Sequence, residues 1–231
     1  MYKDFIAIIP ARSGSTRLKD KNISKLNGRP LYTYSTNQAI RLFEKSIIST
    51  NFSLILESFF DDRITIDERP AELCLNTTPM SEVISYLIHK YQLQGKNIVL
   101  LQPTSPLRSD VDVINAVEQF SSTKCSMLMT VSEVSSSILK CGFIDNGTFV
   151  SLSNRTEDIF SNDQALRTIY KPNGAIYIFN ADDFIKSNNN FPSQNIYCIS
   201  MPKNRSIDIN TEEDLIKAQK EIFDIIGRSK Y

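Results

Sequence analysis

A group of cations and hydroxyls follows the first apolar run of the chain. Residues 6–22 read IAIIPARSGSTRLKDKN, and the charged part holds Arg12, Arg17 and Lys21. Residues 13–15 form a small-residue turn, whose glycine permits conformations that other residues resist and whose N–H groups suit an anion. Guanidinium groups fork onto phosphate oxygens, and an ammonium adds a point charge. A polyphosphate site is therefore predicted without a GxxxxGK[ST] or GxGxxG motif; the alternative is a solvated basic loop.

A rigid polar loop is predicted at LLQPTSPLR, residues 100–108. Its two prolines restrict the backbone directly after an apolar run, which suits a site whose groups must be preorganised. Gln102 would lie at the tip of a strand with both amide donors and an acceptor free. The alternative is a plain connector with an exposed Arg108.

A carboxylate suited to a metal ion lies in RSIDIN, residues 205–210. Asp208 stands between two isoleucines, so it points to the opposite face of an extended segment. Hard oxygen ligands suit Mg²⁺ on a triphosphate. The alternative is an N-cap segment before the last helix, a role that Asn210 fits. Another polar pair, Asn173 and Gly174, begins an apolar run and could form either part of a site or an ordinary turn.

The overall composition limits the partners. The 231 residues carry 26 basic and 26 acidic side chains, which argues against general nucleic-acid binding and against an anionic membrane surface. No apolar run approaches the roughly 20 residues of a membrane-spanning helix. Four widely spaced cysteines and an N-terminus that runs directly into a strand indicate reduced thiols, no signal peptide and a cytoplasmic location.

The elements that must position these residues alternate along the chain. Short apolar runs alternate with helical stripes, which predicts an α/β fold: a mostly parallel sheet with helices on both faces. Sites in such sheets lie beyond the carboxyl ends of the strands. The cationic segment after the first strand, the loop QPTSPLR and the residues after strand 126–132 would therefore lie along the same edge. The expected strands are 5–11, 46–51, 97–102, 126–132 and 173–180. The expected helices are 30–43, a short one at 55–60, 81–92, 109–120 and 212–226.

One long segment departs from this alternation. Residues 132–171 are polar, with few apolar runs and no clear periodicity. A stretch of this kind within a compact domain usually carries function or packs on a partner. We therefore expect one domain, residues 1–231, with an excursion at 132–171.

Five motifs together resemble the CMP-sialic acid synthetase family, the acylneuraminate and related nonulosonate cytidylyltransferases. They are, in order, IIPARSGSTRLKDKN, RPAEL, LLQPTSPLR, PNGAIYI and SIDINTEEDL, and the likeness runs from Ile6 to about Leu215. The resemblance implies a nucleotide-binding α/β sheet with a dimerisation arm that caps the active site of the partner in a homodimer. It also implies Mg²⁺-dependent transfer of CMP from CTP to the anomeric hydroxyl of a nine-carbon 2-keto acid sugar such as sialic or legionaminic acid, with release of pyrophosphate.

The resemblance also assigns roles to individual residues. Catalytic roles fall to Arg12, Lys21 and Asp208, and metal binding falls to Asp208 and Asn210. Nucleotide binding is assigned to Arg12, Gly14, Ser15, Arg17, Lys21, Asn22, Arg69 and Thr78. Sugar binding is assigned to Gln102, Lys140, Gln164, Asn173 and Gly174.

Several positions depart from the family pattern. A common lysine is replaced by Thr16 beside Arg17, and amides replace acidic residues at Asn76 and at the second metal position, Asn210. The arginine expected before Gln164 is missing, so recognition of the sugar carboxylate would fall to Lys140 with Arg155 or Arg167. An amide oxygen can still ligate Mg²⁺, but with less charge.

Two alternatives stay open. The string STRL, residues 15–18, resembles the sister family that uses the eight-carbon acid Kdo. The lost acidic groups also fit a non-catalytic nucleotide-binding protein of the same fold. Nucleotidyl transfer needs positioning and charge stabilisation, with no covalent nucleophile, so the scarcity of histidine agrees with an enzyme.

Overall fold

A seven-stranded sheet forms the centre of the computed structural model, which describes residues 1–58, 60–153 and 155–228. The strand order is β11-β7-β10-β6-β1-β4-β5. Neighbouring strands are parallel, except that β10 is antiparallel to both β6 and β7. The predicted mostly parallel α/β sheet is confirmed. The strands are β1 (Tyr2–Ala11), β4 (Phe43–Thr50), β5 (Ile64–Glu68), β6 (Asn97–Leu101), β7 (Met127–Val134), β10 (Ile169–Asn180) and β11 (Ile196–Ser200).

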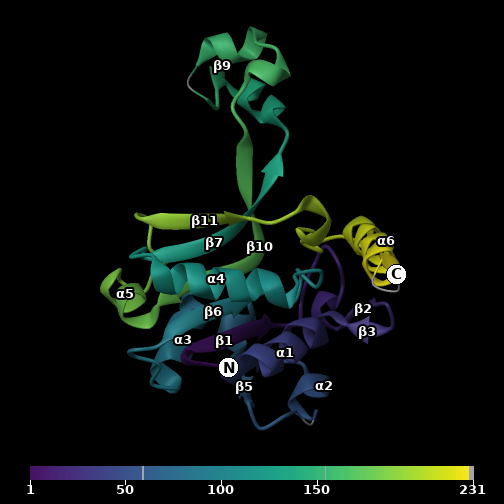
Figure 1. The fold of residues 1–231 in the computed structure, drawn as a ribbon, viewed down its shortest axis with the longest axis vertical. Helices are drawn as coiled ribbons and strands as arrows, with labels where there is room; N and C mark the ends of the chain where they lie inside the picture. Colours follow the sequence, from purple (N-terminus) through teal and green to yellow (C-terminus); the bar gives the residue numbers. More distant parts are fainter. Residues whose placement is uncertain (59, 154, 229–231) are drawn as a thin grey trace.

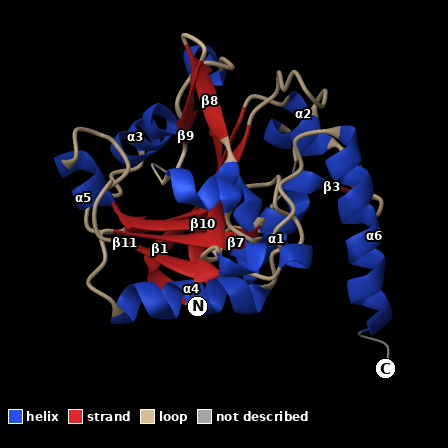
Figure 2. Cartoon of the chain, turned by 90° about the horizontal axis from the view of Figure 1, so that it is seen from above, coloured by secondary structure: helices blue, strands red, loops and turns tan. Residues whose placement is uncertain are grey.

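Helices cover both faces of this sheet (Figure 2). Strand β1 is buried on both sides: Ala7 and Ile9 face one core, and Ile6 and Ile8 face the other, which explains its unbroken apolar sequence. Helices α1, α2 and α4 pack in the first core, and α3 and α5 pack in the second. The helices are α1 (Leu31–Leu42), α2 (Ser53–Leu56), α3 (Met80–Lys90), α4 (Asp110–Ser122), α5 (Ala181–Lys186) and α6 (Glu212–Arg228).

A smaller core attaches α6 to the body. Ile209, directly before α6, packs with Leu26 and Leu31, and Ala218 of α6 joins the same cluster. Leu26 belongs to a short hairpin of β2 (Lys25–Leu26) and β3 (Arg29–Pro30). The segment that carries Asp208 is therefore held against the sheet by its apolar neighbours.

Two strands of the sheet were not predicted. Strand β5 mixes apolar and acidic residues, ITIDE, and β11 is a largely exposed edge strand, IYCIS; short strands of this kind carry a weak sequence signal. Strand β10 begins at Ile169 instead of residue 173, because its first residues pair with the end of β7. Its antiparallel direction was also not evident, since direction depends on the path of the excursion.

The excursion is an arm that projects from the body (Figure 1). Strands β7 and β10 pair along its base, and residues beyond them form a hairpin of β8 (Gly142–Asp145) and β9 (Thr148–Ser151) with short 3-10 turns. The expectation of a polar segment was incomplete, because the arm exposes large apolar side chains. These are Phe143, Ile144, Phe149, Val150, Leu152 and Phe160.

Candidate functional site

Polar residues meet where the parallel strands end. Arg12 follows β1, Asn51 follows β4, Arg69 follows β5, and Gln102 follows β6. Because β10 runs in the opposite direction, its early residues reach the same edge of the sheet. The pocket at this edge brings together six of the predicted residues. Its lining is Pro10, Arg12, Ser15, Lys21, Asn22, Arg69, Met80, Gln102, Pro103 and Thr104.

The loop after β1 has a fixed shape. Asn51 accepts a hydrogen bond from the Ser13 N–H and donates one to Ser13 Oγ, both at 2.8 Å. Asn22 is buried and donates from Nδ2 to the Arg12 carbonyl oxygen at 2.8 Å. Gly14 has a φ of +76°, a conformation that glycine adopts readily. Asn51 was missed by the sequence analysis, although its place directly after a predicted strand was a usable signal.

The guanidinium of Arg12 is held by neutral groups. It donates to Asn76 Oδ1 at 2.8 Å and to the carbonyl oxygen of Ser13 at 3.0 Å. An aspartate at position 76 would neutralise Arg12, whereas the amide leaves its charge available to the pocket. Thr78, predicted to bind nucleotide, instead donates its hydroxyl to the Glu72 carbonyl oxygen at 3.1 Å and does not line this pocket.

Arg69 is buried and connected to a carboxylate through a serine. Its Nε donates to Ser49 Oγ at 3.1 Å, and Ser49 Oγ donates to Asp67 Oδ2 at 2.7 Å. Burial lowers the pKa of Arg69 to about 10, against the opposing effects of Cys74 and Asp67. Asp67 is fully buried, and its other oxygen accepts a hydrogen bond from Lys90 at 2.7 Å. This connection was not predicted from the sequence, because it joins two strands through one small side chain.

A second polar pocket adjoins the first around Asp208. It is lined by Arg17, Asn173, Asp208 and Asn210, among others. Asn210 Oδ1 accepts hydrogen bonds from Lys21 Nζ at 2.9 Å and Arg17 Nη2 at 3.2 Å. Asn210 Nδ2 donates to Asp208 Oδ2 at 2.7 Å. Burial lowers the pKa of Lys21, and the nearby Asp208 opposes that shift.

The donor set around Asp208 suits a metal held together with phosphates. Among the described residues, Asp208 Oδ1 is buried and has no hydrogen-bond partner. A Cβ at Gly174 would lie 3.6–3.8 Å from this carboxylate, so the glycine keeps space beside it. The described residues contain no group of three or more His, Cys, Asp or Glu side chains that could hold a metal ion by themselves. Mg²⁺ commonly binds through one or two carboxylates and substrate phosphates, so the residues fit such an ion.

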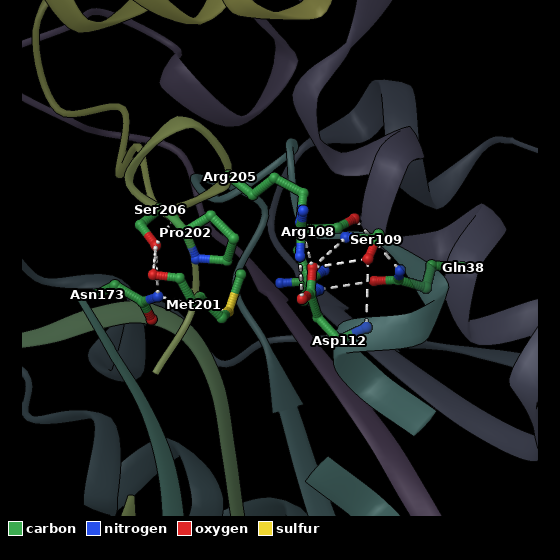
Figure 3. A network of polar contacts seen from close by, with 9 residues as sticks. All are labelled: Gln38, Arg108, Ser109, Asp112, Asn173, Met201, Pro202, Arg205 and Ser206. Carbon is green, nitrogen blue, oxygen red and sulfur yellow. Dashed lines mark hydrogen bonds and ion pairs between the residues drawn. The ribbon is translucent and has the colours of Figure 1, made fainter. Parts of the chain in front are cut away.

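Arg108 is a buried structural residue, so the exposed alternative was wrong (Figure 3). Its Nη1 donates to the Ala175 carbonyl oxygen at 2.6 Å and to the Gln102 carbonyl oxygen at 3.4 Å. Its Nε donates to Gln38 Oε1 at 2.6 Å. Burial lowers the pKa of Arg108 to about 10. This side chain therefore ties the Gln102 loop to the start of the β10 segment beside Gly174.

The loop before Asp208 is anchored at two places, both visible in Figure 3. Arg205 forms a two-pronged ion pair with Asp112 at 2.8 and 2.9 Å. Asn173 Nδ2 donates to Ser206 Oγ at 3.0 Å, and Asn173 Oδ1 accepts from Thr130 Oγ1 at 2.7 Å. Asn173 was expected at the sugar, and the structure shows both ends of its buried side chain engaged in these contacts.

Two predicted sugar-binding residues lie on the arm. Lys140 forms an ion pair with Asp163 at 2.7 Å, and Gln164 is exposed on the adjoining turn. The arm projects away from the body (Figure 1), and neither residue lines the pockets around Gln102 and Asp208. One chain therefore does not bring these two residues to Gln102 and Asp208.

An apolar pocket lies on the other side of Gln102. Tyr177 and Phe191 line it together with methionines and an isoleucine. Burial raises the pKa of Tyr177, and Asp208 raises it further. These residues were not predicted from the sequence, because apolar side chains at a strand end resemble core residues until the position of each strand is known.

Comparison with known proteins agrees with this geometry. A family model described as "Cytidylyltransferase" matches residues 6–225. The chain belongs to this cytidylyltransferase family. It is 31% identical to an N-acylneuraminate cytidylyltransferase of Streptococcus agalactiae serotype III, over 94% of this chain and 53% of the relative. It is 29% identical to the CMP-N,N'-diacetyllegionaminic acid synthase of Legionella pneumophila, over 93% of this chain and 94% of the relative.

The two relatives differ in length. This cytidylyltransferase-family chain spans about half the length of the streptococcal relative, which it covers to 53%. Among solved structures, a CMP:2-keto-3-deoxy-manno-octonic acid synthetase complexed with CTP has the same fold, with a TM-score of 0.68 and 15% identity over 95% of this chain and 98% of the other.

Within the described residues, every helix is too short or too polar to span a membrane.

Proposed function

We propose that this chain transfers CMP from CTP to the anomeric hydroxyl of a nonulosonic acid, with release of pyrophosphate. The observation that carries the proposal is the convergence of Arg12, Lys21, Arg69 and Gln102 on one pocket, beside Asp208. Its relatives named for N-acylneuraminate, legionaminic and pseudaminic acid substrates support the acceptor class.

The residues of the pocket divide the reaction between them. The turn at residues 13–15 binds the triphosphate together with Arg12 and Lys21, and Arg69 lies beside the cytosine base of CTP. Asp208 would hold Mg²⁺, which would supply charge neutralisation on the phosphates. The anomeric hydroxyl releases its proton as its oxygen forms a bond to the α-phosphorus of CTP, and the bond from that phosphorus to the pyrophosphate oxygen breaks. Fixed cations stabilise the departing negative charge without rearrangement.

The apolar pocket favours a nonulosonic acid over Kdo. Nonulosonic acids such as sialic acid carry acylamino groups, whereas Kdo carries hydroxyls in their place. The pocket lined by Tyr177 and Phe191 lies next to Gln102, the residue predicted to contact the sugar. Burial of an acyl methyl there is favourable, and a hydroxyl would lose hydrogen bonds with water.

The arm supports a homodimer. The arm exposes apolar side chains that water does not favour, including Ile144 and Phe160, which are 79% and 85% exposed. It also carries Lys140 and Gln164 away from the pockets of its own chain. We propose that a second copy covers the arm and that each arm brings its polar residues to the partner's sugar pocket.

Product identification tests the acceptor. The protein is incubated with CTP, Mg²⁺ and one of N-acetylneuraminic, legionaminic or pseudaminic acid, with Kdo as the parallel acceptor. Mass spectrometry should detect a CMP-linked nonulosonic acid and little CMP-Kdo. Formation of CMP-Kdo alone would overturn the assignment of the acceptor. CTP bound without any product would favour the non-catalytic alternative.

A further inference from the structure

The amide of Asn210 is held at both ends, in a way that bears on how metal reaches Asp208. Lys21 and Arg17 can only donate hydrogen bonds, so the atom that faces them must be Oδ1. The Asp208 carboxylate can only accept, so the atom that faces it must be Nδ2. The chemistry of its three neighbours therefore fixes the orientation of the amide.

Both oxygen lone pairs of the Asn210 side chain are occupied by cationic donors. The donor atoms of Lys21 and Arg17 lie 2.9 and 3.2 Å from Oδ1. A metal ion bound to this oxygen would approach two positive charges and displace their hydrogen bonds. Asn210 in this arrangement is thus poorly suited to ligate a cation.

The same amide removes the need for a cation to hold the Asp208 carboxylate in place. Asn210 Nδ2 donates a hydrogen bond to Asp208 Oδ2 at 2.7 Å. The other carboxylate oxygen, Asp208 Oδ1, is buried without a partner among the described residues. An aspartate at position 210 would place a second negative oxygen near Oδ2, and the two carboxylates would repel until a cation bound. The amide donor removes this repulsion and orients Asp208 without a metal.

We propose that Asn210 is a positioning residue for Asp208 instead of a second metal ligand, and that divalent metal enters this site with the nucleotide. One carboxylate supplies too little charge to retain a free ion, and phosphate oxygens supply the remaining ligands. This inference rests on the proposed nucleotide site and specifies how that site acquires its ion.

Binding of Mn²⁺ to the nucleotide-free protein tests this directly. Mn²⁺ is the probe, because electron paramagnetic resonance distinguishes free from bound ion without any turnover. The Asn210→Asp variant should bind Mn²⁺ at least about tenfold more tightly than wild type, since it adds a charged oxygen ligand. Adding Asp208→Asn to that variant should return the affinity to the wild-type level.

The matched control is Asn115→Asp, which adds a negative charge on the exposed face of α4. It should leave Mn²⁺ binding unchanged, and circular dichroism should show each variant folded. Equal affinity of folded wild type and Asn210→Asp for Mn²⁺ would overturn the inference. This readout uses no sugar acid, so its failure is distinct from failure of the proposed reaction, which appears as absence of a CMP-sugar.

Discussion

At the scale of single residues, Arg69 depends on a serine. Arg69 is 3% exposed, and Ser49 Oγ accepts a hydrogen bond from its Nε while donating one to the buried carboxylate of Asp67. Arg69 has no direct carboxylate partner at hydrogen-bond distance among the described residues. The hydroxyl and the backbone carbonyl oxygen of Ser49 therefore fix the direction of the Arg69 side chain. Arg69 is therefore positioned from the interior of the sheet.

Replacement of Ser49 should weaken CTP binding. Ser49→Ala removes one hydrogen bond to a charged group, so we expect the KM for CTP to rise about tenfold. Steady-state kinetics at saturating sugar acid measures this. Ser46→Ala is the matched control on the same strand, because the Ser46 hydroxyl is buried without a partner in the described structure. An unchanged KM in folded Ser49→Ala would show that Arg69 does not need this contact.

Residues whose type indicates ligand chemistry were easier to predict from the sequence than the residues that hold them in position. Arg12, Lys21 and Asp208 stand beside motifs whose chemistry is evident from residue type. The roles of Asp67 and Asn51 depend on contacts across strands, which local patterns do not encode. Arg108 shows the same limit: it was identified within its motif, but its burial became clear only in the folded chain.

At the scale of elements, the β10 backbone bends where it meets Asp208. Register with β7 shifts between Pro172 and Tyr177, and Gly174 in this stretch has a φ of +75°. A side chain there would lie 3.6 Å or slightly more from the Asp208 carboxylate. The strand thus leaves space for the candidate metal by lacking one Cβ.

A pair of glycine variants separates backbone strain from the effect on the site. Gly174→Ala and Gly95→Ala, at φ values of +75° and +74°, should each lower stability by about 1–2 kcal/mol. Gly95 has nothing within 4 Å of an added Cβ, so its variant should keep wild-type activity. Gly174→Ala should lose activity at least about tenfold, because the added methyl would be in van der Waals contact with the Asp208 carboxylate and would fill the space beside it. Thermal melting and rate measurements check both; equal activity of the two variants would contradict a role for Gly174 at the site.

Helix α4 anchors the loop before Asp208 through its own N-terminus. Asp112 completes a capping box with Ser109 and pairs with Arg205. Burial alone would raise the pKa of Asp112, but hydrogen bonds from Arg205 and Ser109 outweigh burial, and the pKa is lowered from 3.8. A carboxyl whose pKa is lowered in the folded state stabilises the fold at any pH above its pKa in the unfolded chain. That stabilisation is lost as the pH falls through the pKa of the folded state.

Replacement of Asp112 should therefore matter more at neutral than at acid pH. Asp112→Asn should lower the free energy of unfolding by about 2–3 kcal/mol at pH 7, and by less once acid protonates the wild-type carboxylate. Denaturant unfolding across this pH range measures both values. Glu118→Gln, an exposed position of the same helix, is the control and should change stability little. A loss for Asp112→Asn that is constant with pH would contradict this account.

At the scale of the whole molecule, the arm projects away from the body (Figure 1). The sequence predicted the body well, because buried parallel strands and amphipathic helices have strong periodic signals. It located the arm at 132–171 but not its hairpin or its exposed apolar surface. The hairpin and its apolar side chains remain exposed in a single chain, so they do not follow from the need to bury apolar residues within one copy.

The arm predicts a dimer that one substitution should dissociate. Ile144→Asp places a charge on the apolar surface of the arm, so light scattering should show a monomer where wild type is a dimer. Val111→Asp, at a position 60% exposed on α4 in the body, should stay dimeric. A wild-type monomer at the concentration used for activity would contradict the proposed arrangement.

Mixed dimers test whether the arm completes the partner's site. Lys140→Ala and Asp208→Ala should each be nearly inactive alone. If Lys140 acts in the partner's pocket, a heterodimer holds one intact site and one doubly altered site. A reassorted equal mixture should then recover about a quarter of wild-type activity. No recovery, with reassortment verified, would indicate that each chain uses its own arm.

The central claim is that the Asp208 pocket transfers CMP to a nonulosonic acid, and pyrophosphate release measures this most directly. Wild type is assayed with CTP, Mg²⁺ and each of N-acetylneuraminic, legionaminic and pseudaminic acid, with Asp208→Ala in parallel. We expect sugar-dependent pyrophosphate release from at least one acid, and a rate about a thousandfold lower in folded Asp208→Ala. Absence of sugar-dependent release with all three acids, or full activity of Asp208→Ala, would contradict the account.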